Sequence, residues 1–352
     1  MLTEDAQRMM RWYQKNKRIL PWRELSDPYA VMVSEIMLQQ TTVAAVIPKY
    51  QRWMGRFPDV ASLAEADLEE VLSHWSGLGY YQRARRLHQA ARRIADMGLF
   101  PDTLEDLKSL PGFGPYTAAA VASICFERPE LAADTNVIRV LFRYYKLAAS
   151  ASDRASLTEI KRRTRSTLET IVPGDFNQAL MELGAGPCSV TRPSCRECPL
   201  HRGCGARASK SGPEAFPTPS PKKAPRKTPG LGLLLQDRDR QTLLLRGTSI
   251  GLLRDLFQPP LVFQEGEGPL AETSRTLLNS FGNSPWEDQW ELQYGISGRR
   301  LNLECRLWTA HRKEVEAVLA RLLPDKDYLW WKPEPETKVP VSTLTRKVLR
   351  LA

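Results

Sequence analysis

The chain has 352 residues, about two domains of ordinary size, and 42% of them are hydrophobic, enough for sizeable cores. Its formal net charge is +10, which favours an anionic partner such as nucleic acid over a merely soluble basic protein. No apolar run of about 18 residues occurs, so no membrane span is predicted. The first residues, MLTEDAQRMMRWYQK, lack the apolar core of an export signal. A cytoplasmic protein that binds nucleic acid is therefore expected.

Residues 1–206 are predicted to form an all-helical domain. Apolar residues recur at helical spacing in YAVMVSEIMLQQTTVAAVIPKYQRWM, in LEEVLSHWSGLGYYQRARRLHQAARRIADM and in FNQALMELGA. Prolines and glycines, Pro48 among them, punctuate this pattern and are expected to separate the helices. No part of this region resembles a strand.

Residues 207–229 differ in composition from what precedes them. Prolines recur, and residues 207–227 carry six Lys or Arg against one acid, Glu214. This composition predicts a stiff, extended and exposed linker. After it, residues 230–352 are expected to form an α+β domain. Strands are predicted in GLGLLLQD, QTLLLRG, PPLVFQE and NLECRLWTA, and helices in AETSRTLLNSF and RKEVEAVLARLL.

The segment LPGFGPYTAAAV places Gly112 and Gly114 immediately before an alanine-rich helix. Glycines permit backbone conformations closed to other residues, and N–H groups at a helix N-terminus attract anions. The segment has neither the lysine of a Walker loop nor the third glycine of a dinucleotide fingerprint. It predicts a helix–hairpin–helix that grips a nucleic-acid backbone, with an ordinary glycine turn between helices as the alternative.

Four of the six cysteines fall within 17 residues, at the spacing Cys188-x6-Cys195-x2-Cys198-x5-Cys204. Without an export signal, a metal centre is favoured over disulfides. Zinc and a [4Fe–4S] cluster both accept four cysteines. One close pair flanked by wider gaps favours iron–sulfur, because zinc modules usually offer two close pairs. The other two cysteines are expected to be packed thiols.

Two carboxylates stand out against apolar surroundings. Glu35 lies in VMVSEIMLQQTT, where it is either paired or desolvated with a raised pKa that lets it donate a proton near neutrality. Asp134 precedes NVIRVLFRYY and is also the natural N-cap of that helix. Capping and catalysis are compatible. Two carboxylates in different environments suit cleavage of a glycosidic bond.

The stretch GLGYYQRARRLHQAARR sets Tyr80 and Tyr81 beside several arginines near a glycine bend. Aromatic and basic residues in this arrangement suit contact with a DNA backbone and insertion into a base stack. The alternative is a solvated basic helix face with its tyrosines in the core.

Taken together, these motifs resemble the helix–hairpin–helix DNA glycosylase superfamily and, within it, the adenine glycosylases of the MutY family. The resemblance covers essentially the whole chain. It is carried, in the family's order, by LPWR, SEIMLQQTTV, WSGLGYYQRARRLH, LPGFGPYTAAAV, DTNVIRV, FNQALMELGA and the cysteine loop, residues 188–204. It implies a helical glycosylase domain with an iron–sulfur loop, followed by a Nudix-like α+β domain that recognises 8-oxoguanine.

The resemblance also implies catalytic roles. Glu35 resembles the general acid that protonates adenine N7, and Asp134 the carboxylate that stabilises the oxocarbenium ion and the covalent sugar intermediate. Asn136 would hydrogen-bond within this set. The related endonuclease III carries a lysine nucleophile where this chain has Tyr116. We therefore expect base release without strand cleavage, with Tyr116 against the sugar and Asp134.

Other implied roles concern DNA and the cofactor. Gln40 and Tyr80 resemble the residues that insert into the DNA stack, and the four cysteines would hold a [4Fe–4S] cluster. The lesion-sensing loop of the family usually contains Phe-Ser-His, and its counterpart here is Ile296-Ser297-Gly298, so Ser297 alone matches. A second departure is Thr135, which stands where the family usually has glycine. The magnesium-binding helix of nucleotide-hydrolysing Nudix enzymes is missing, so pyrophosphatase activity is not expected.

The predicted function is base excision repair by a monomeric, monofunctional glycosylase. It would remove adenine mispaired with 8-oxoguanine or guanine in double-stranded DNA, after flipping the base out of the duplex. Thr135 and the altered sensing loop keep open a glycosylase for another mismatch, such as thymine opposite guanine. A DNA-binding or electron-transfer iron–sulfur protein without enzymatic activity is the third hypothesis, against which Glu35 and Asp134 argue.

Overall fold

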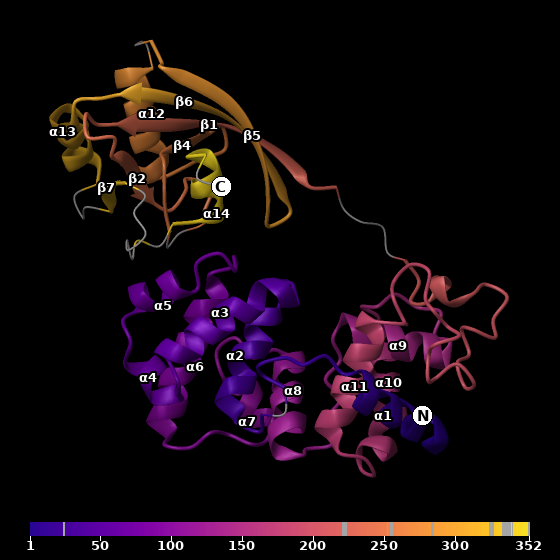
Figure 1. The fold of residues 1–352 in the computed structure, drawn as a ribbon. Coiled ribbons are helices and arrows are strands. Elements are labelled where there is room, and N and C mark those ends of the chain that lie inside the picture. Colours follow the sequence, from indigo (N-terminus) through magenta and orange to yellow (C-terminus); the bar gives the residue numbers. More distant parts are fainter. Residues whose placement is uncertain are drawn as a thin grey trace. The chain divides into compact units, whose positions relative to one another are not determined.

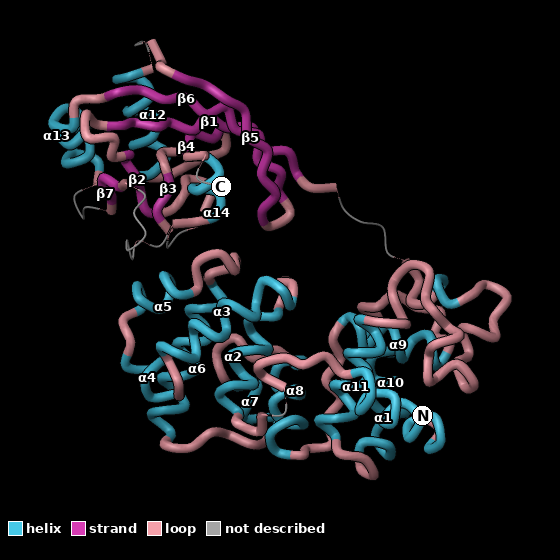
Figure 2. Tube along the Cα trace, in the orientation of Figure 1, coloured by secondary structure: helices cyan, strands magenta, loops and turns pink. Residues whose placement is uncertain are grey.

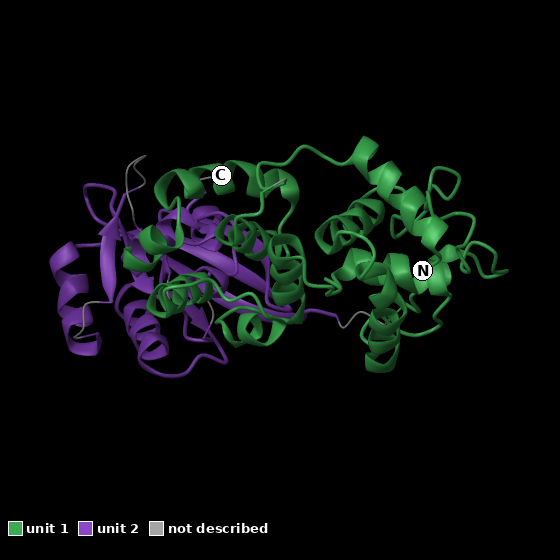
Figure 3. Cartoon of the chain, turned by 90° about the horizontal axis from the view of Figure 1, so that it is seen from below, with its two compact units in different colours: residues 1–66, 86–221 green, residues 67–85, 222–352 purple. Residues whose placement is uncertain are grey.

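The computed structural model describes residues 1–23, 25–219, 224–251, 253, 256–282, 285–323, 327–332, 339 and 341–350. Two compact units divide the chain (Figure 3). The first unit comprises residues 1–66 and 86–221, and the second unit comprises residues 67–85 and 222–352. In sequence, residues 67–85 lie inside the predicted helical domain, and no feature of their composition sets them apart.

The first unit is built of helices (Figures 1 and 2). Up to Thr218 the described residues contain no strand, as predicted. The helices are α1 (Thr3–Asn16), α2 (Pro28–Leu38), α3 (Val43–Arg56), α4 (Val60–Glu65), α6 (Gln82–Met97), α7 (Leu104–Ser109), α8 (Pro115–Phe126), α9 (Thr135–Tyr145), α10 (Arg154–Leu168) and α11 (Pro173–Ala185). The first residues of α6 belong to the second unit.

Helix α2 begins where the sequence offers both a cap and a pre-set backbone. The Asp27 carboxylate accepts hydrogen bonds from the backbone N–H groups of Tyr29 and Ala30, and Pro28 occupies the first turn. Every residue from Tyr29 to Met37 is buried, so α2 runs through the core. Each large apolar side chain buried there contributes about 1.5–3 kcal/mol. Glu35 is carried into the protein interior by this helix.

The long helical stretch predicted after residue 28 is interrupted. It breaks between α2 and α3 at Gln40, whose φ of 57° is left-handed. The expectation that Pro48 separates helices was wrong, because Pro48 lies inside α3. Burial of Val46, Tyr50 and Trp53 along one face holds α3 together across the proline.

Helices α9 and α11 pack very closely because glycine lies at their contact. A Cβ added at Gly184 would lie 2.5 Å from Cβ of Asn136. Nearby, a Cβ at Gly174 would lie 2.7 Å from Cα of Ile124 on α8. Helix α11 is thereby fixed against both α8 and α9, and it forms one side of the cavity described below.

The second unit contains a mixed sheet in the order β3-β2-β1-β6-β5, with β4 paired to β1 and β7 paired to β2. Its strands are β1 (Arg226–Gln236), β2 (Thr242–Arg246), β3 (Phe257–Gln258), β4 (Leu261–Phe263), β5 (Asp288–Ile296), β6 (Arg299–Thr309) and β7 (Tyr328–Trp331). Its helices are α5 (Leu68–His74), α12 (Pro269–Phe281), α13 (Arg312–Leu322) and α14 (Thr343–Val348). The predicted strands and helices are confirmed. Strands β3, β5 and β7 and helix α14 were missed.

Strands β5 and β6 form a long antiparallel hairpin (Figure 2). Ile296 pairs with Arg299, so Ser297 and Gly298 form a two-residue turn with φ of 47° and 73°. Two positive φ angles match the type I′ turn that fits the twist of a hairpin. The predicted lesion-sensing residues therefore form the tip of this hairpin.

The predicted linker is shorter than its composition indicated. Phe216 is buried, its carbonyl accepts from Arg143 Nε at 3.0 Å, and Thr218 N donates to Ala149 O at 2.8 Å. Strand β1 begins at Arg226, so the last four residues of the predicted linker belong to this strand. The Phe216 ring is buried, and the buried Arg143 guanidinium needs hydrogen-bond acceptors. Together these contacts outweigh the extended, exposed conformation that the prolines favour. None of the described helices could span a bilayer.

Candidate functional site

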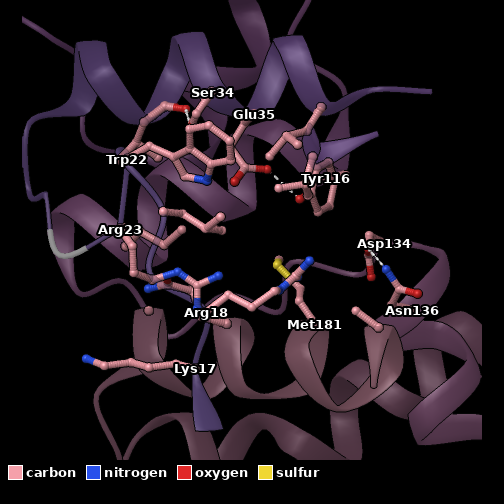
Figure 4. A pocket seen from close by; sticks show the side chains of 18 of the residues that line it. Lys17, Arg18, Trp22, Arg23, Ser34, Glu35, Tyr116, Asp134, Asn136 and Met181 are labelled. Carbon is pink, nitrogen blue, oxygen red and sulfur yellow. Dashed lines mark hydrogen bonds between the residues drawn. The ribbon is translucent and has the colours of Figure 1, made fainter. Parts of the chain in front are cut away.

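A cavity of about 710 Å³ opens in the first unit among α2, α8, α9, α11 and the loop after α1 (Figure 4). Its lining brings together five residues that the sequence singled out in three separate motifs: Glu35, Gln40, Tyr116, Asp134 and Asn136. Figure 4 shows Glu35 and Tyr116 on one wall, with Asp134 and Asn136 on another.

Glu35 is a desolvated carboxyl group. Its side chain is 6% exposed, and burial raises its pKa to about 7, with the nearby Asp134 carboxylate acting in the same direction. The Tyr116 hydroxyl donates a hydrogen bond to Glu35 Oε2, which partly opposes the shift. A carboxyl group with this pKa is protonated in about half of the molecules at neutral pH and can donate a proton.

Tyr116 lies at the start of α8, directly after the glycine hairpin. Its hydrogen bond goes to Glu35, a partner that the sequence did not predict. Burial, followed by the two nearby carboxylates, raises the pKa of Tyr116 well above its usual value. Tyr116 therefore stays protonated and acts as a donor that holds Glu35 in place.

Asp134 is the N-cap of α9, as predicted. Its Oδ1 accepts from the backbone N–H of Val137 at 2.6 Å, and its Oδ2 accepts from Asn136 Nδ2 at 3.0 Å. Burial raises its pKa, whereas these hydrogen bonds and the positive end of the helix dipole favour its anion. The two carboxyl groups of one cavity thus have different surroundings.

Two buried arginines support the Asp134 wall from behind. Arg139 donates to Asn136 Oδ1 at 2.8 Å, to the Gly184 carbonyl at 2.6 Å and to the Cys188 carbonyl at 3.0 Å. Arg143 is 2% exposed and donates to carbonyls of Ser189, Val190 and Phe216. The catalytic candidates are therefore connected by hydrogen bonds to the cysteine loop.

An ion-pair cluster that no sequence motif indicated adjoins the same cavity, which its two arginines, Arg18 and Arg23, line. Glu182 is 5% exposed, and its carboxylate pairs with Arg18 at 2.9 Å and with Arg23 at 2.7 Å. Tyr13 accepts a hydrogen bond from Arg23 at 3.1 Å. Glu182 lies in the apolar helix FNQALMELGA, the same pattern that drew attention to Glu35, so the pattern could have found it.

The glycine hairpin differs from its prediction at one position. Gly112 has a φ of 85°, and a Cβ there would lie 2.8 Å from Cβ of Arg86. Gly114 has a φ of −82°, which any residue can adopt, and no atom lies within 4 Å of the place where its Cβ would be. Gly114 is the N-cap of α8 without a side-chain cap, so it leaves the first N–H groups of that helix uncovered.

The remaining DNA-contact candidates have left-handed backbone conformations. Gln40 has a φ of 57°, and Tyr80 and Ser297 each have a φ of 47°. Gln40 belongs to the first unit and lines the cavity, whereas Tyr80 and Ser297 belong to the second unit. Tyr80 is 50% exposed, and the Arg83 guanidinium lies 5.6 Å from its ring centroid. Left-handed conformations in residues other than glycine are costly and concentrate at functional sites.

The four clustered cysteines border the same small cavity. Cys188, Cys195, Cys198 and Cys204 are free thiols that line one small cavity, along with Arg143 and His201. Within the described ranges, no three His, Cys, Asp or Glu side chains converge where a single metal ion could bind. Cys305 is buried and Cys125 half-buried, in keeping with packed thiols.

Comparison with known proteins identifies the helical part. Residues 33–166 match the model of the HhH-GPD superfamily base excision DNA repair proteins. The adenine DNA glycosylase of Mus musculus is 44% identical over 58% of this chain and 42% of its own length. That of Arabidopsis thaliana is 33% identical over 88% of this chain and 56% of its own. That of Buchnera aphidicola subsp. Acyrthosiphon pisum is 38% identical over 62% and 63%.

The chain spans about half the length of the curated relatives that it matches. The matched region contains Glu35, Tyr116 and Asp134, which line the cavity. The chain is similar in sequence to the adenine DNA glycosylases, and its residues 33–166 match the HhH-GPD superfamily of base excision DNA repair proteins.

Proposed function

We propose that this chain is a monofunctional DNA glycosylase that removes adenine mispaired with 8-oxoguanine or guanine. The observation that carries the proposal is the pairing of Glu35 with Asp134 in one cavity. The former is a desolvated carboxyl group with a pKa of about 7, and the latter is an anion at a helix N-terminus. Hydrolysis of an N-glycosidic bond needs an acid for the leaving base and an anion for the cationic sugar.

Glu35 donates the proton. An extruded adenine that enters the cavity receives it at N7, and the bond between base and sugar then breaks with its electron pair going to the base. The Tyr116 hydroxyl keeps the Glu35 carboxyl group oriented towards the cavity. Since Tyr116 supplies no amine, the sugar cannot form a Schiff base at this position, and strand cleavage is not expected.

Asp134 acts on the sugar. Its carboxylate stabilises the oxocarbenium ion and takes up the sugar carbon until water completes the hydrolysis. Asn136 and Arg139 hold Asp134 in its orientation through successive hydrogen bonds. These supports keep the anion at the helix N-terminus rather than in a flexible rotamer.

The cavity lining suits either base. Arg23 lines the cavity, and a guanidinium donates hydrogen bonds to the ring nitrogens of adenine or to the carbonyl oxygens of thymine. Removal of thymine opposite guanine therefore stays an alternative, which the assay below decides.

The partner is a double-stranded DNA that carries the mismatch, bound by a monomer. The uncovered N–H groups at the start of α8, next to Gly112 and Gly114, suit a backbone phosphate. Gln40 and Tyr80 are assigned to insertion in the base stack and Ser297 to the base opposite adenine. The second unit, with its mixed sheet, would serve as a Nudix-like domain for recognition of 8-oxoguanine.

We assign a [4Fe–4S] cluster to the four clustered cysteines. Four free thiols around one cavity fit its donor set, because each iron of such a cluster takes one cysteine at a separate corner. When bound, the cluster supplies four cross-links within the loop. Arg139 and Arg143 of α9 donate hydrogen bonds to carbonyls of that loop and so connect it to the Asp134 wall.

The decisive experiment is a single-turnover assay on duplexes that place adenine opposite 8-oxoguanine, adenine opposite guanine, and thymine opposite guanine. Adenine release without strand cleavage is expected, and adenine opposite 8-oxoguanine should react fastest. Faster release of thymine than of adenine would overturn the proposal. Iron and sulfide analysis of the purified protein tests the cluster, and zinc in place of iron would contradict it.

A further inference from the structure

One face of the sheet near the β5–β6 hairpin tip carries two exposed cations side by side. Lys227 on β1 is in register with Arg300 on β6, and Arg300 is in register with Gly295 on β5. Residues in register across neighbouring strands point to the same face, and neighbouring strands lie about 4.8 Å apart. Gly295 has no atom within 4 Å of the position of a Cβ, so the surface is open beside Arg300.

Like charges directly opposite each other destabilise a sheet unless something compensates them. Further along the same face, Glu291 and Glu304 also oppose each other, and Arg306 relieves them through a bond to Glu304 at 2.6 Å. No described carboxylate lies within ion-pair distance of Lys227 or Arg300. The contrast leaves an uncompensated cationic pair at the tip end of this face.

The opposite face of the same strands shows that the fold can neutralise arginines here. Arg226 and Arg299 point to that side, and both pair with Glu265, Arg299 at 3.2 Å. Charge compensation is therefore present one residue away on either strand, whereas no carboxylate that the structure describes pairs with Lys227 or Arg300. The fold gains no described ion pair from these two cations.

Between the cationic pair and the Glu291–Glu304 pair lies a row of amides. Gln293 and Asn302 are in register, and Asn302 Oδ1 is a buried atom without a described hydrogen-bond partner. The cationic and acidic rows are four residues apart along each strand, about 13 Å. The surface thus offers two positive charges and adjoining amides over a length that suits one or two phosphate groups.

We propose that this face, defined by Lys227, Arg300, Gln293 and Asn302, binds the phosphate backbone of the DNA strand whose base is contacted by the Ser297 turn. The inference rests on the proposed function and adds a second DNA contact in the second unit. Two unpaired cations gain a partner of opposite charge, and counterions are released from the DNA. The amides donate hydrogen bonds to phosphate or sugar oxygens. Such contacts fix position without reading sequence.

The test compares two variants of the full chain that lose the same charge. The first is Lys227→Gln with Arg300→Gln. The matched control is Lys313→Gln with Arg321→Gln, which removes two exposed cations from α13 in the same unit. Fluorescence anisotropy measures Kd for an adenine–8-oxoguanine duplex between 50 and 200 mM salt. Single-turnover base release is measured at saturating DNA.

We expect the Lys227–Arg300 variant to bind about 5–50-fold more weakly and its slope of log Kd against log salt to fall by about 1–2. The single-turnover rate at saturating DNA should stay within about twofold of wild type, because the cavity is untouched. The control should keep the wild-type slope. Equal slopes for both variants would overturn the inference, even if adenine release is normal.

Failure of the proposed function has a different signature. If the wild-type protein binds the duplex and releases no adenine, the function fails while the slope comparison still decides the surface. Thermal unfolding of each variant shows whether it is folded. Arg300→Glu is the sharper single change and should weaken binding beyond Arg300→Gln. Equal affinity of these two would contradict a phosphate contact.

Discussion

The two walls of the cavity place their carboxyl groups in different surroundings. The α2 wall surrounds Glu35 with apolar side chains and one hydroxyl donor, which brings its pKa to about 7. The α9 wall gives Asp134 a backbone N–H, an amide donor and a helix N-terminus. Burial raises the pKa of both carboxyl groups, but Glu35 accepts from a single hydroxyl, whereas Asp134 accepts from a backbone N–H and an amide that favour its anion.

The largest expected effect comes from removing the acid. Glu35→Gln keeps the shape and the hydrogen bond from Tyr116 but has no proton to give. Single-turnover release of adenine should fall about 10²–10⁴-fold, the usual contribution of a positioned acid. Duplex Kd should change by less than about threefold. Equal rates for wild type and variant would show that the α2 wall has no acid role.

The second effect concerns the support of the α9 wall. Arg139→Met removes the bonds to Asn136, Gly184 and Cys188 while keeping an apolar stem of similar length. Base release should fall about 10–100-fold because Asp134 loses its fixed orientation. Arg162→Met on exposed α10 is the control and should be neutral. A pH profile separates the roles, since a purely structural loss would lower the rate equally at every pH.

The third effect is on stability and has a defined sign. The raised pKa of Glu35 means that the folded state binds a proton more tightly than the unfolded chain, so stability falls as pH rises through about 7. Glu35→Gln removes this cost and should raise the free energy of unfolding by about 1–3 kcal/mol at pH 8, and by less at pH 5. Urea unfolding at both pH values measures it, and an equal change at both would refute the desolvation of Glu35.

The smallest effect is expected from Tyr116→Phe. Its hydrogen bond opposes the raised pKa of Glu35, so losing the hydroxyl should raise that pKa further. Base release at neutral pH should change only a few-fold. The basic limb of the pH–rate profile should move to higher pH by less than about one unit. A shift towards lower pH would mean that Tyr116 supports the protonated rather than the ionised acid.

The sequence predicted the parts of this site that depend on local context. Glu35 and Asp134 were predicted because a carboxylate within an apolar helix, and one directly before a helix, can be recognised from the sequence alone. Glu182 shows the same apolar context, but its ion pairs come from Arg18 and Arg23, far away in the chain, and no periodicity brings them together. Strand β5 was missed because the prediction followed short apolar runs, whereas the apolar residues of β5, Trp290, Leu292, Tyr294 and Ile296, alternate with polar ones.

Other differences also depend on tertiary structure. The buried side chain of Phe216 anchors a segment that the proline content assigned to an exposed linker. Gly114 was expected to need an unusual backbone and instead adopts an ordinary one at an uncovered helix start. In both cases the residue type drew attention to the right position. The conformation found there depends on tertiary neighbours, which the composition does not reveal.

The contact between Gly184 and Asn136 has a consequence for interpreting variants of this chain. A methyl group at position 184 would meet Asn136 Cβ at 2.5 Å, where neither helix has room to yield without moving the other. A Gly184→Ala variant alters no group that touches DNA, a base or a proton. In an activity screen it would nevertheless be recorded as a catalytic defect, because the displaced Asn136 no longer holds Asp134. Loss of activity can thus begin at a residue with no chemistry of its own.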